Sequence, residues 1–221
     1  MFNKIFNLII FLIIVFFNSV RAEINGDVYL SGVSKYLWRG QELYNSFALQ
    51  PGFDLYYKYF SFGLWNSFHV EKKELYEIDL TLSYSVTFKK YILLKTGYTY
   101  YSQPKEEYLD SHELFLNLIF DWKVSPVLKV FYDFDDGNGF YTEFVVLCPF
   151  KLGINFSFDV SLGYNYGQWN YDPSFTVMTL NLNSKISAGK FDIIPSILGQ
   201  ISFDKQYKND FVGSLNVIWN F

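Results

Sequence analysis

The chain has a single cysteine, Cys148, so neither an intrachain disulfide nor a multi-cysteine metal site can form. Basic residues are also few: 18 Lys and Arg stand against 22 Asp and Glu, giving a net charge of −4. An acidic chain of this kind is not expected to bind nucleic acid, because nucleic-acid-binding proteins present basic faces. Beyond residue 22 no apolar run approaches the roughly 20 residues that a membrane-spanning helix needs. The mean hydropathy is only +0.07, so a bundle of membrane helices is excluded.

What the chain has in abundance is aromatic side chains, which make up 22% of it. A membrane β-barrel carries such residues as girdles at its two interfaces. Here they gather where the expected strands end. One end would carry Tyr56, Tyr57, Tyr59, Phe60 and Trp122, and the other Tyr100, Tyr101, Tyr166, Trp169 and Tyr171.

Residues 1–22 have the features of a secretory signal peptide. Lys4 precedes the apolar run Ile5 to Phe17, and Val20-Arg21-Ala22 resembles a cleavage site. The run is shorter than the roughly 20 residues of a spanning helix, although an uncleaved anchor stays an alternative. Without Lys4 and Arg21, the mature chain 23–221 has 16 basic and 22 acidic residues, a charge of −6. It contains no linker and is expected to form one domain.

Apolar and polar residues alternate along most of the mature chain, as they do in β-strands. In 75–88 one row is Tyr76, Ile78, Leu80, Leu82, Tyr84, Val86 and Phe88, and the other Glu77, Asp79, Thr81, Ser83, Ser85 and Thr87. The pattern predicts twelve strands, with ten or fourteen as alternatives: 26–38, 46–57, 60–70, 75–88, 91–101, 111–123, 126–134, 140–148, 153–165, 174–186, 191–203 and 210–221. A soluble sandwich would alternate in the same way with its apolar face inward, so the period alone does not decide the class.

Loop lengths separate the two classes, because they alternate between short and long. The short connections are 58–59, 89–90, 125–126 and 187–190, and the long ones are 39–45, 102–110, 135–139, 166–173 and 204–209. Short periplasmic turns facing longer external loops are typical of outer-membrane barrels. We therefore predict an all-β fold: a transmembrane antiparallel up-and-down barrel of about twelve strands in the outer membrane of a Gram-negative bacterium. The first strand must pair with the last, because an open edge cannot persist in lipid.

The final strand alternates strictly and ends on Phe221, as the closing strands of outer-membrane barrels do. We predict that Trp219 and Phe221 form the signal that the barrel-assembly machinery recognises. The expected partners are this machinery and the lipid bilayer.

Charged residues recur on the row that would face the lumen. The predicted lumen-lining set is Lys35, Arg39, Asp54, Glu77, Asp79, Lys95, Glu113, Asp121, Lys123, Lys129, Asp133, Glu143, Asp159, Lys185 and Asp192. These residues would either line a pore or pair with one another to hold the barrel shut. Twelve tilted strands give a backbone radius of about 12 Å, which leaves a narrow path at most. The mixed signs of charge indicate no ion preference and no particular solute.

One motif resembles a known family. Ser34-Lys35-Tyr36-Leu37-Trp38-Arg39-Gly40-Gln41 is similar to the Ser-x-Tyr-x-x-Arg-Gly signature near the mature amino terminus of the TorF-type porins. The stretches 50–54 and 61–67 resemble the hairpin that follows in that family, so the likeness covers about residues 28–70. It implies an outer-membrane barrel. Arg39 is expected to end the first strand and to pair with an interior carboxylate.

Signals of enzyme or metal chemistry are weak, and we predict no catalytic residue, metal or cofactor. His69, near Ser67, falls on the lumen row, and His112 on the lipid row, where it is expected to be an interfacial residue. The acidic loop 133–139 fails the spacing of a calcium-binding EF-hand. Passive diffusion of small solutes is the leading function. A closed structural or adhesive barrel and a lipid-modifying enzyme are the alternatives.

Overall fold

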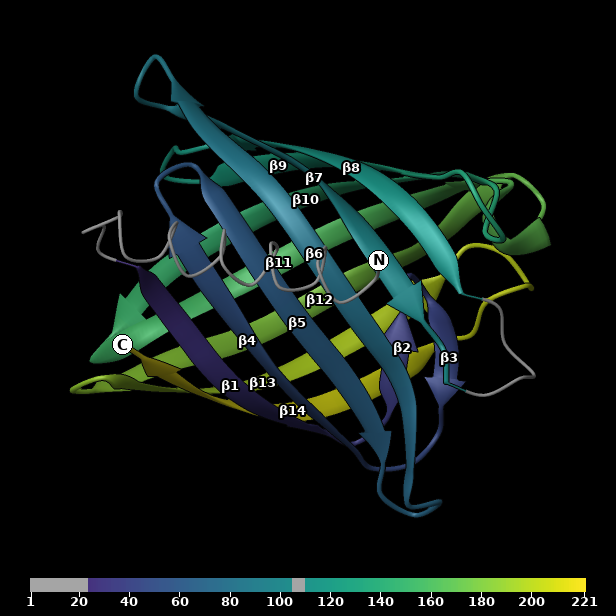
Figure 1. The fold of residues 1–221 in the computed structure, drawn as a ribbon, viewed down its shortest axis with the longest axis horizontal. Helices are drawn as coiled ribbons and strands as arrows, with labels where there is room; N and C mark the ends of the chain where they lie inside the picture. Colours follow the sequence, from purple (N-terminus) through teal and green to yellow (C-terminus); the bar gives the residue numbers. More distant parts are fainter. Residues whose placement is uncertain (1–23, 105–109) are drawn as a thin grey trace, which may run out of the picture.

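The computed structural model describes residues 24–104 and 110–221, so the predicted signal peptide lies outside the described residues. The described chain forms a closed antiparallel barrel of twelve strands (Figure 1), which confirms the predicted fold class and strand number. Its wall strands are β1 (Asn25–Val33), β4 (Ala48–Tyr57), β5 (Phe60–His69), β6 (Glu74–Phe88), β7 (Ile92–Ser102), β8 (Ser111–Phe120), β9 (Ser125–Asp133), β10 (Gly139–Leu152), β11 (Ile154–Tyr166), β12 (Ser174–Ala188), β13 (Phe191–Ser202) and β14 (Asp210–Asn220).

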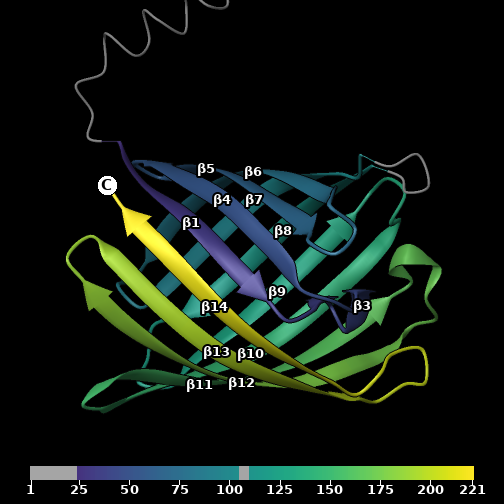
Figure 2. The same ribbon diagram turned by 90° about the horizontal axis from the view of Figure 1, so that it is seen from below.

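The barrel closes where its first strand meets its last. β1 pairs with β4 on one side and with β14 on the other. The Phe221 N–H donates to the carbonyl of Gly26 at 2.9 Å, which extends this seam beyond β14. Both ends of the barrel chain therefore lie at one end of the molecule (Figure 2). Closure removes the unpaired edges that an open sheet would expose.

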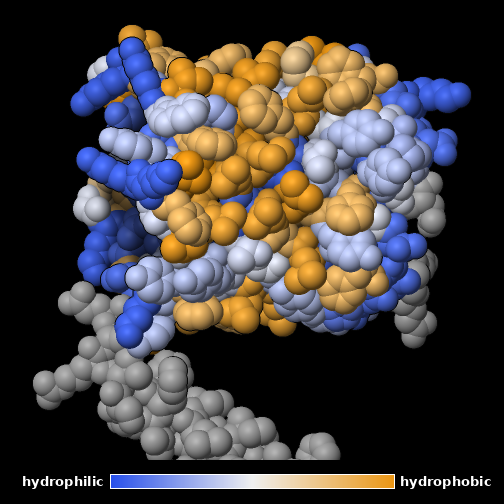
Figure 3. Space-filling model, turned by 90° about the horizontal axis from the view of Figure 1, so that it is seen from above, coloured by the Kyte–Doolittle hydropathy of each residue, from blue (hydrophilic) through white to orange (hydrophobic). Residues whose placement is uncertain are grey.

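The outer surface is apolar along its middle. Leu80, Leu82 and Tyr84 on β6 are all exposed, whereas Ser83 between them is buried. On the face shown in Figure 3, hydrophobic side chains cover the middle of the barrel and hydrophilic ones gather at both ends. In the described part of the chain, no helix has the length and apolar character to cross a bilayer.

Tight turns lie at the end that carries the termini, and longer loops at the other. Lys58, Lys89 and Lys90 take positive φ angles in the tight turns. Strand β10 was expected to end at 148 but continues through Pro149 to Leu152. Its neighbour β9 begins at Ser125, opposite Leu147, so Pro149 lies past the end of that ladder. Proline is tolerated at such an edge.

The expected first strand, 26–38, is wrong in its second half. β1 ends at Val33, and β2 (Tyr36–Trp38) pairs with β3 (Gln41–Tyr44) as a separate hairpin. The turn between them is Arg39-Gly40, with φ angles of 49° and 86°. The hairpin lies inside the barrel near the long-loop end (Figures 1 and 2). The first external loop predicted at 39–45 is thus an inward hairpin instead.

Two β-bulges place extra side chains inside the barrel. The β5–β6 register shifts between Ser67 and Phe68, and the β11–β12 register shifts between Leu162 and Tyr164. A bulge adds one residue to a strand and re-aims the side chains around it. Tyr76 is consequently buried, which corrects its expected place on the lipid-facing row, and Val177 is buried as well.

Candidate functional site: the inward hairpin and the lumen

The inward hairpin is tied to the wall at its base. The Ser34 N–H donates to the carbonyl of Gly213 at 2.9 Å, and the Gly213 N–H donates to Ser34 Oγ at 3.0 Å. The Lys35 ammonium then bonds Asp210 at 2.7 Å and Glu42 at 3.3 Å. The hydrogen bond from Lys35 to Asp210 raises the pKa of this ammonium. Ser34 and Lys35, which follow β1, are therefore bonded to β14. The chain turns into the barrel after these two residues.

The tip of the hairpin is held by a buried ion pair. Arg39 Nη1 and Nη2 donate to the two oxygens of Glu113 at 2.6 and 2.8 Å, and Nη1 also donates to Gln168 Oε1 at 2.8 Å. Gln168 Nε2 donates in turn to Glu113 at 3.0 Å. A buried charge is tolerated where a bidentate ion pair and further hydrogen bonds satisfy its donors and acceptors. Arg39 thus has the interior carboxylate partner that its sequence position suggested, although it lies on the hairpin rather than on β1.

Aromatic rings surround the same guanidinium. The Arg39 carbon lies 4.0 Å from the ring centre of Phe131, 4.4 Å from Trp38 and 5.0 Å from Tyr141. Such contacts stabilise a cation electrostatically. They fix the side chain between the hairpin and strands β9 and β10.

The side of the hairpin that faces β5 and β6 is packed by rings. Tyr44 stacks on His69 with ring centres 3.5 Å apart, and His69 stacks on Tyr76 at 4.2 Å. Tyr36 meets Tyr76 edge-on at 6.5 Å and donates its hydroxyl hydrogen to Glu77 at 2.9 Å. His69 is therefore a buried packing residue.

The opposite side of the hairpin rests on the second bulge. A Cβ placed on Gly40 would lie 3.0 Å from Val177 Cγ1, and the Gly40 carbonyl accepts a hydrogen bond from Gln200 Nε2 at 3.1 Å. Only glycine combines this positive φ with so close an approach. Each bulge residue, Tyr76 and Val177, therefore contacts the hairpin.

Most of the other predicted lumen residues interact along the wall. Lys129 pairs with Glu143 at 2.7 Å on neighbouring strands. Lys185 pairs with Asp192 at 2.7 Å across the β12–β13 turn.

Hydrogen bonds satisfy two further carboxylates on the wall. Asp159 accepts hydrogen bonds from Ser157 and, at 3.0 Å, from Asn183. Both oxygens of the fully buried Asp133 lie 2.8 Å from Ser111 Oγ, and they share its one hydroxyl hydrogen. The lumen wall is therefore a set of local pairs rather than a ring of one sign of charge.

Five predicted lumen residues make neither an ion pair nor a side-chain hydrogen bond in the described part of the chain. Asp54, Asp79 and Lys95 are half-buried on strands β4, β6 and β7. Asp121 and Lys123 are exposed in the β8–β9 turn, because β8 ends at Phe120, three residues earlier than expected. The prediction that these last two line the wall is wrong.

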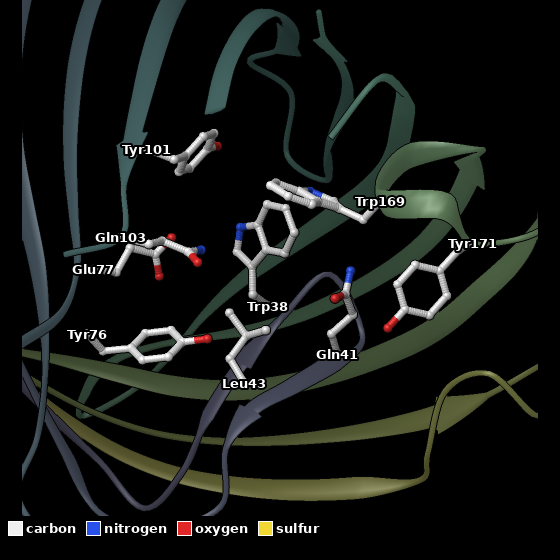
Figure 4. Close-up of a pocket in the computed structure, with 9 residues that line it drawn as sticks. All are labelled: Trp38, Gln41, Leu43, Tyr76, Glu77, Tyr101, Gln103, Trp169 and Tyr171. Atoms are coloured by element: carbon white, nitrogen blue, oxygen red, sulfur yellow. The ribbon is translucent and has the colours of Figure 1, made fainter. Parts of the chain in front are cut away.

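A cavity opens between the hairpin and the loops, which we call the vestibule cavity (Figure 4). It has a volume of about 270 Å³ and is lined by Trp38, Gln41, Leu43, Tyr76, Glu77, Tyr101, Gln103, Trp169 and Tyr171. Three of these, Tyr101, Trp169 and Tyr171, were expected in the outer aromatic girdle. Tyr101 is inside because it follows the inward row of β7, and Trp169 because it lies in the short helix η1 (Gln168–Asn170).

The remaining histidine lies on the outer wall. The His112 ring lies 5.0 Å from Tyr100 and 5.9 Å from Phe134, and His112 Nδ1 hydrogen-bonds Tyr98 at 2.5 Å. Its other nitrogen is 3.6 Å from Asp135. The His112 side chain therefore packs among aromatic rings on the outer wall. Among the described residues, no cluster of His, Cys, Asp and Glu could hold a metal.

No family model and no curated protein matches this sequence. Solved structures do match its fold. The KdgM porin in complex with disordered oligogalacturonate has a TM-score of 0.60 at 10% sequence identity, covering 89% of this chain and 99% of KdgM. The NanC porin has a TM-score of 0.58 at 7% identity, covering 88% and 98%. The chain therefore has the barrel fold of these small porins over nearly its whole described length.

Proposed function

We propose that this protein is a bacterial outer-membrane channel through which small solutes diffuse passively, and that the inward hairpin forms its constriction. The apolar band on the barrel surface supports a position in lipid. The predicted signal peptide and closing strand support export and insertion by the barrel-assembly machinery. The porins that share the fold are channels by name, and the same activity is proposed for this chain.

The observation that carries the proposal is that the hairpin narrows the lumen without filling it. A second cavity, of about 190 Å³, lies between the hairpin and the wall, and it is lined in part by Lys35, Gln50, Asn181, Ser196 and Ser214. A third, of about 280 Å³, lies beside Gly40 and Glu42 near Tyr207 and Lys208. Cavities on several sides of an inward segment, each lined in part by polar side chains, are what a slim aqueous path requires.

The finer assignment, to the TorF-type porins, is also part of the proposal. Its support is that the signature residues share one structural task. Ser34 joins the hairpin to β14, Tyr36 bonds Glu77, Arg39 bonds Glu113, and Gly40 permits the turn. The signature residues of this chain therefore all help to fix one hairpin in the lumen.

Conductance of the refolded protein in a planar bilayer tests the proposal. We expect the unaltered protein to give small conductance steps of constant size. Arg39→Gln removes the charge that locks the tip to Glu113, so its steps should be larger or noisier. The channel would be refuted if neither the parent nor Arg39→Gln conducts although both are folded. Folding is checked by the difference in gel mobility between heated and unheated samples.

A closed structural or adhesive barrel is the second candidate, and the bidentate Arg39–Glu113 pair favours it. This pair joins the hairpin to β8, and Gln168 extends the bond to the β11–β12 loop. If the lumen is sealed there, the long loops at that end would carry the function. Absence of conductance from well-folded protein in the bilayer would support this candidate.

A further inference from the structure

The vestibule cavity has the composition of a binding site rather than of a simple passage. Five aromatic rings line it, from Trp38, Tyr76, Tyr101, Trp169 and Tyr171. They come from four separate parts of the chain: the hairpin, β6, β7 and the β11–β12 loop (Figure 4). Its volume of about 270 Å³ lies just below the roughly 300–1,000 Å³ of sites for drug-sized ligands. A smaller ligand therefore fits it.

An acidic side chain faces this cavity. Glu77 is the only charged residue among those that line it, and it is 3% exposed. Its neighbour along the inward row of β6, Asp79, has an oxygen that is buried with no hydrogen-bond partner among the described residues. Neither carboxylate forms an ion pair in the described chain. Arg39, the nearest cation on the hairpin, is already neutralised by both oxygens of Glu113.

We propose that the vestibule cavity binds a small organic ammonium ion. The inference deepens the proposed channel function, on which it rests for access to the lumen. A cation held against aromatic faces is attracted by their electron-rich rings, and more strongly where water is excluded. The Glu77 carboxylate supplies the compensating charge. An anionic ligand would face that carboxylate with no free basic side chain on the described lining.

A second feature of this lining is the strained placement of Trp169. Trp169 Nε1 is buried, and no described residue accepts its hydrogen. A buried donor without an acceptor is unfavourable. Trp169 also holds a left-handed backbone conformation, with φ at 58°. The surrounding structure therefore holds Trp169 in a backbone conformation that residues other than glycine rarely adopt.

Tryptophan fluorescence of the refolded protein in detergent micelles tests the site, since Trp38 and Trp169 line it. The probes are choline and neopentyl carbinol, its uncharged analogue with carbon in place of nitrogen. Choline should bind roughly tenfold more tightly or better, because only the charge differs. Glucose and galacturonate should bind more weakly than choline. Equal binding of choline and the uncharged analogue, or tighter binding of either sugar, would overturn the proposal.

Variants locate the effect. Glu77→Gln keeps an acceptor for the Tyr36 hydroxyl and removes the charge, so choline affinity should fall roughly tenfold while the uncharged analogue is unaffected. Asp159→Asn, which removes a carboxylate on β11 that does not line the cavity, should leave both affinities unchanged. Equal losses in the two variants would show a general effect of charge and refute the site. Because micelle binding needs no conduction, choline binding by a protein that conducts nothing would refute the channel alone.

Discussion

At the residue scale, the lumen depends on satisfying buried charges one by one. Glu113 is 1% exposed and accepts hydrogen bonds from Arg39, Gln168 and Tyr101. Removing one member of a buried ion pair leaves the other uncompensated, and that cost exceeds the net value of the pair itself. The tip of the hairpin is therefore the place where a single charge change has its largest effect.

Glu113→Gln tests this directly. We expect the variant to lose about 3–5 kcal/mol of unfolding free energy, because the Arg39 guanidinium stays buried without its counter-charge. Urea unfolding in detergent, followed by gel mobility, measures the change. Glu143→Gln is the matched control, since the Glu143–Lys129 pair is partly exposed, and its loss should be about 1 kcal/mol or less. Similar losses in the two variants would contradict the special role of the tip.

The two faces of β6 provide a second prediction. Leu80 faces outward and is 36% exposed, whereas the neighbouring Asp79 faces inward. Leu80→Lys should impair insertion by about 2–4 kcal/mol near the middle of the bilayer. Asp79→Asn keeps the shape and should insert normally. The measurement is the fraction of protein in outer-membrane extracts whose gel mobility changes on heating, which is the folded fraction. Equal insertion of the two variants would refute the assignment of inward and outward residues on β6.

At the element scale, the inward hairpin is the part that the sequence predicted least well. Tyr36, Leu37 and Trp38 continue the alternation of the preceding strand, so a period-two reading extends that strand to residue 38. The sequence predicts that the first strand ends at Arg39, but the end of a strand does not reveal whether the chain goes outward or inward. That choice depends on Glu113 and Gln168, which lie far along the chain.

The bulges explain the other errors of detail. A strict period assigns Tyr76 to the lipid face, and one extra residue in β6 moves it inside. No local sequence signal marks that shift, because both neighbours fit a strand. The strand number, the closure and the alternation of loop lengths were predictable, since each depends on periodicity and turns alone. The vestibule cavity was not, because its lining comes from four separate parts of the chain.

Gly40→Ala tests how tightly the hairpin is seated. The added methyl would stand 3.0 Å from Val177 at a positive φ, so the tip must shift and the ion pair with Glu113 must loosen. We expect a loss of about 1–3 kcal/mol and larger fluctuations in conductance. Gly199→Ala on β13 is the control, since its methyl would meet nothing within 4 Å. If Gly40→Ala changes neither the unfolding free energy nor the conductance, the hairpin adapts freely to the added methyl group.

At the scale of the whole molecule, the seam between β1 and β14 turns a sheet into a barrel. Seven residue pairs join these strands, from Asp27 with Asn220 to Val33 with Ser214. Gly26 and Phe221 add two backbone hydrogen bonds at 2.9 and 3.3 Å. Phe221 also lies against Trp219, with ring centres 5.2 Å apart. The last residue of the sequence therefore belongs both to the seam and to the outer aromatic surface.

Deleting Phe221 separates a role in assembly from a role in stability. If the terminal aromatic is read by the barrel-assembly machinery, the deletion should lower the amount inserted in cells while export to the periplasm is unchanged. The same deletion protein, refolded from urea into detergent without that machinery, should close normally, because the seven β1–β14 pairs remain. Phe221→Tyr is the control, since it keeps an aromatic ring and both backbone bonds, and it should insert like the parent. Failure of the deletion protein in both settings would assign Phe221 to the seam itself, and success in both would remove it from assembly altogether.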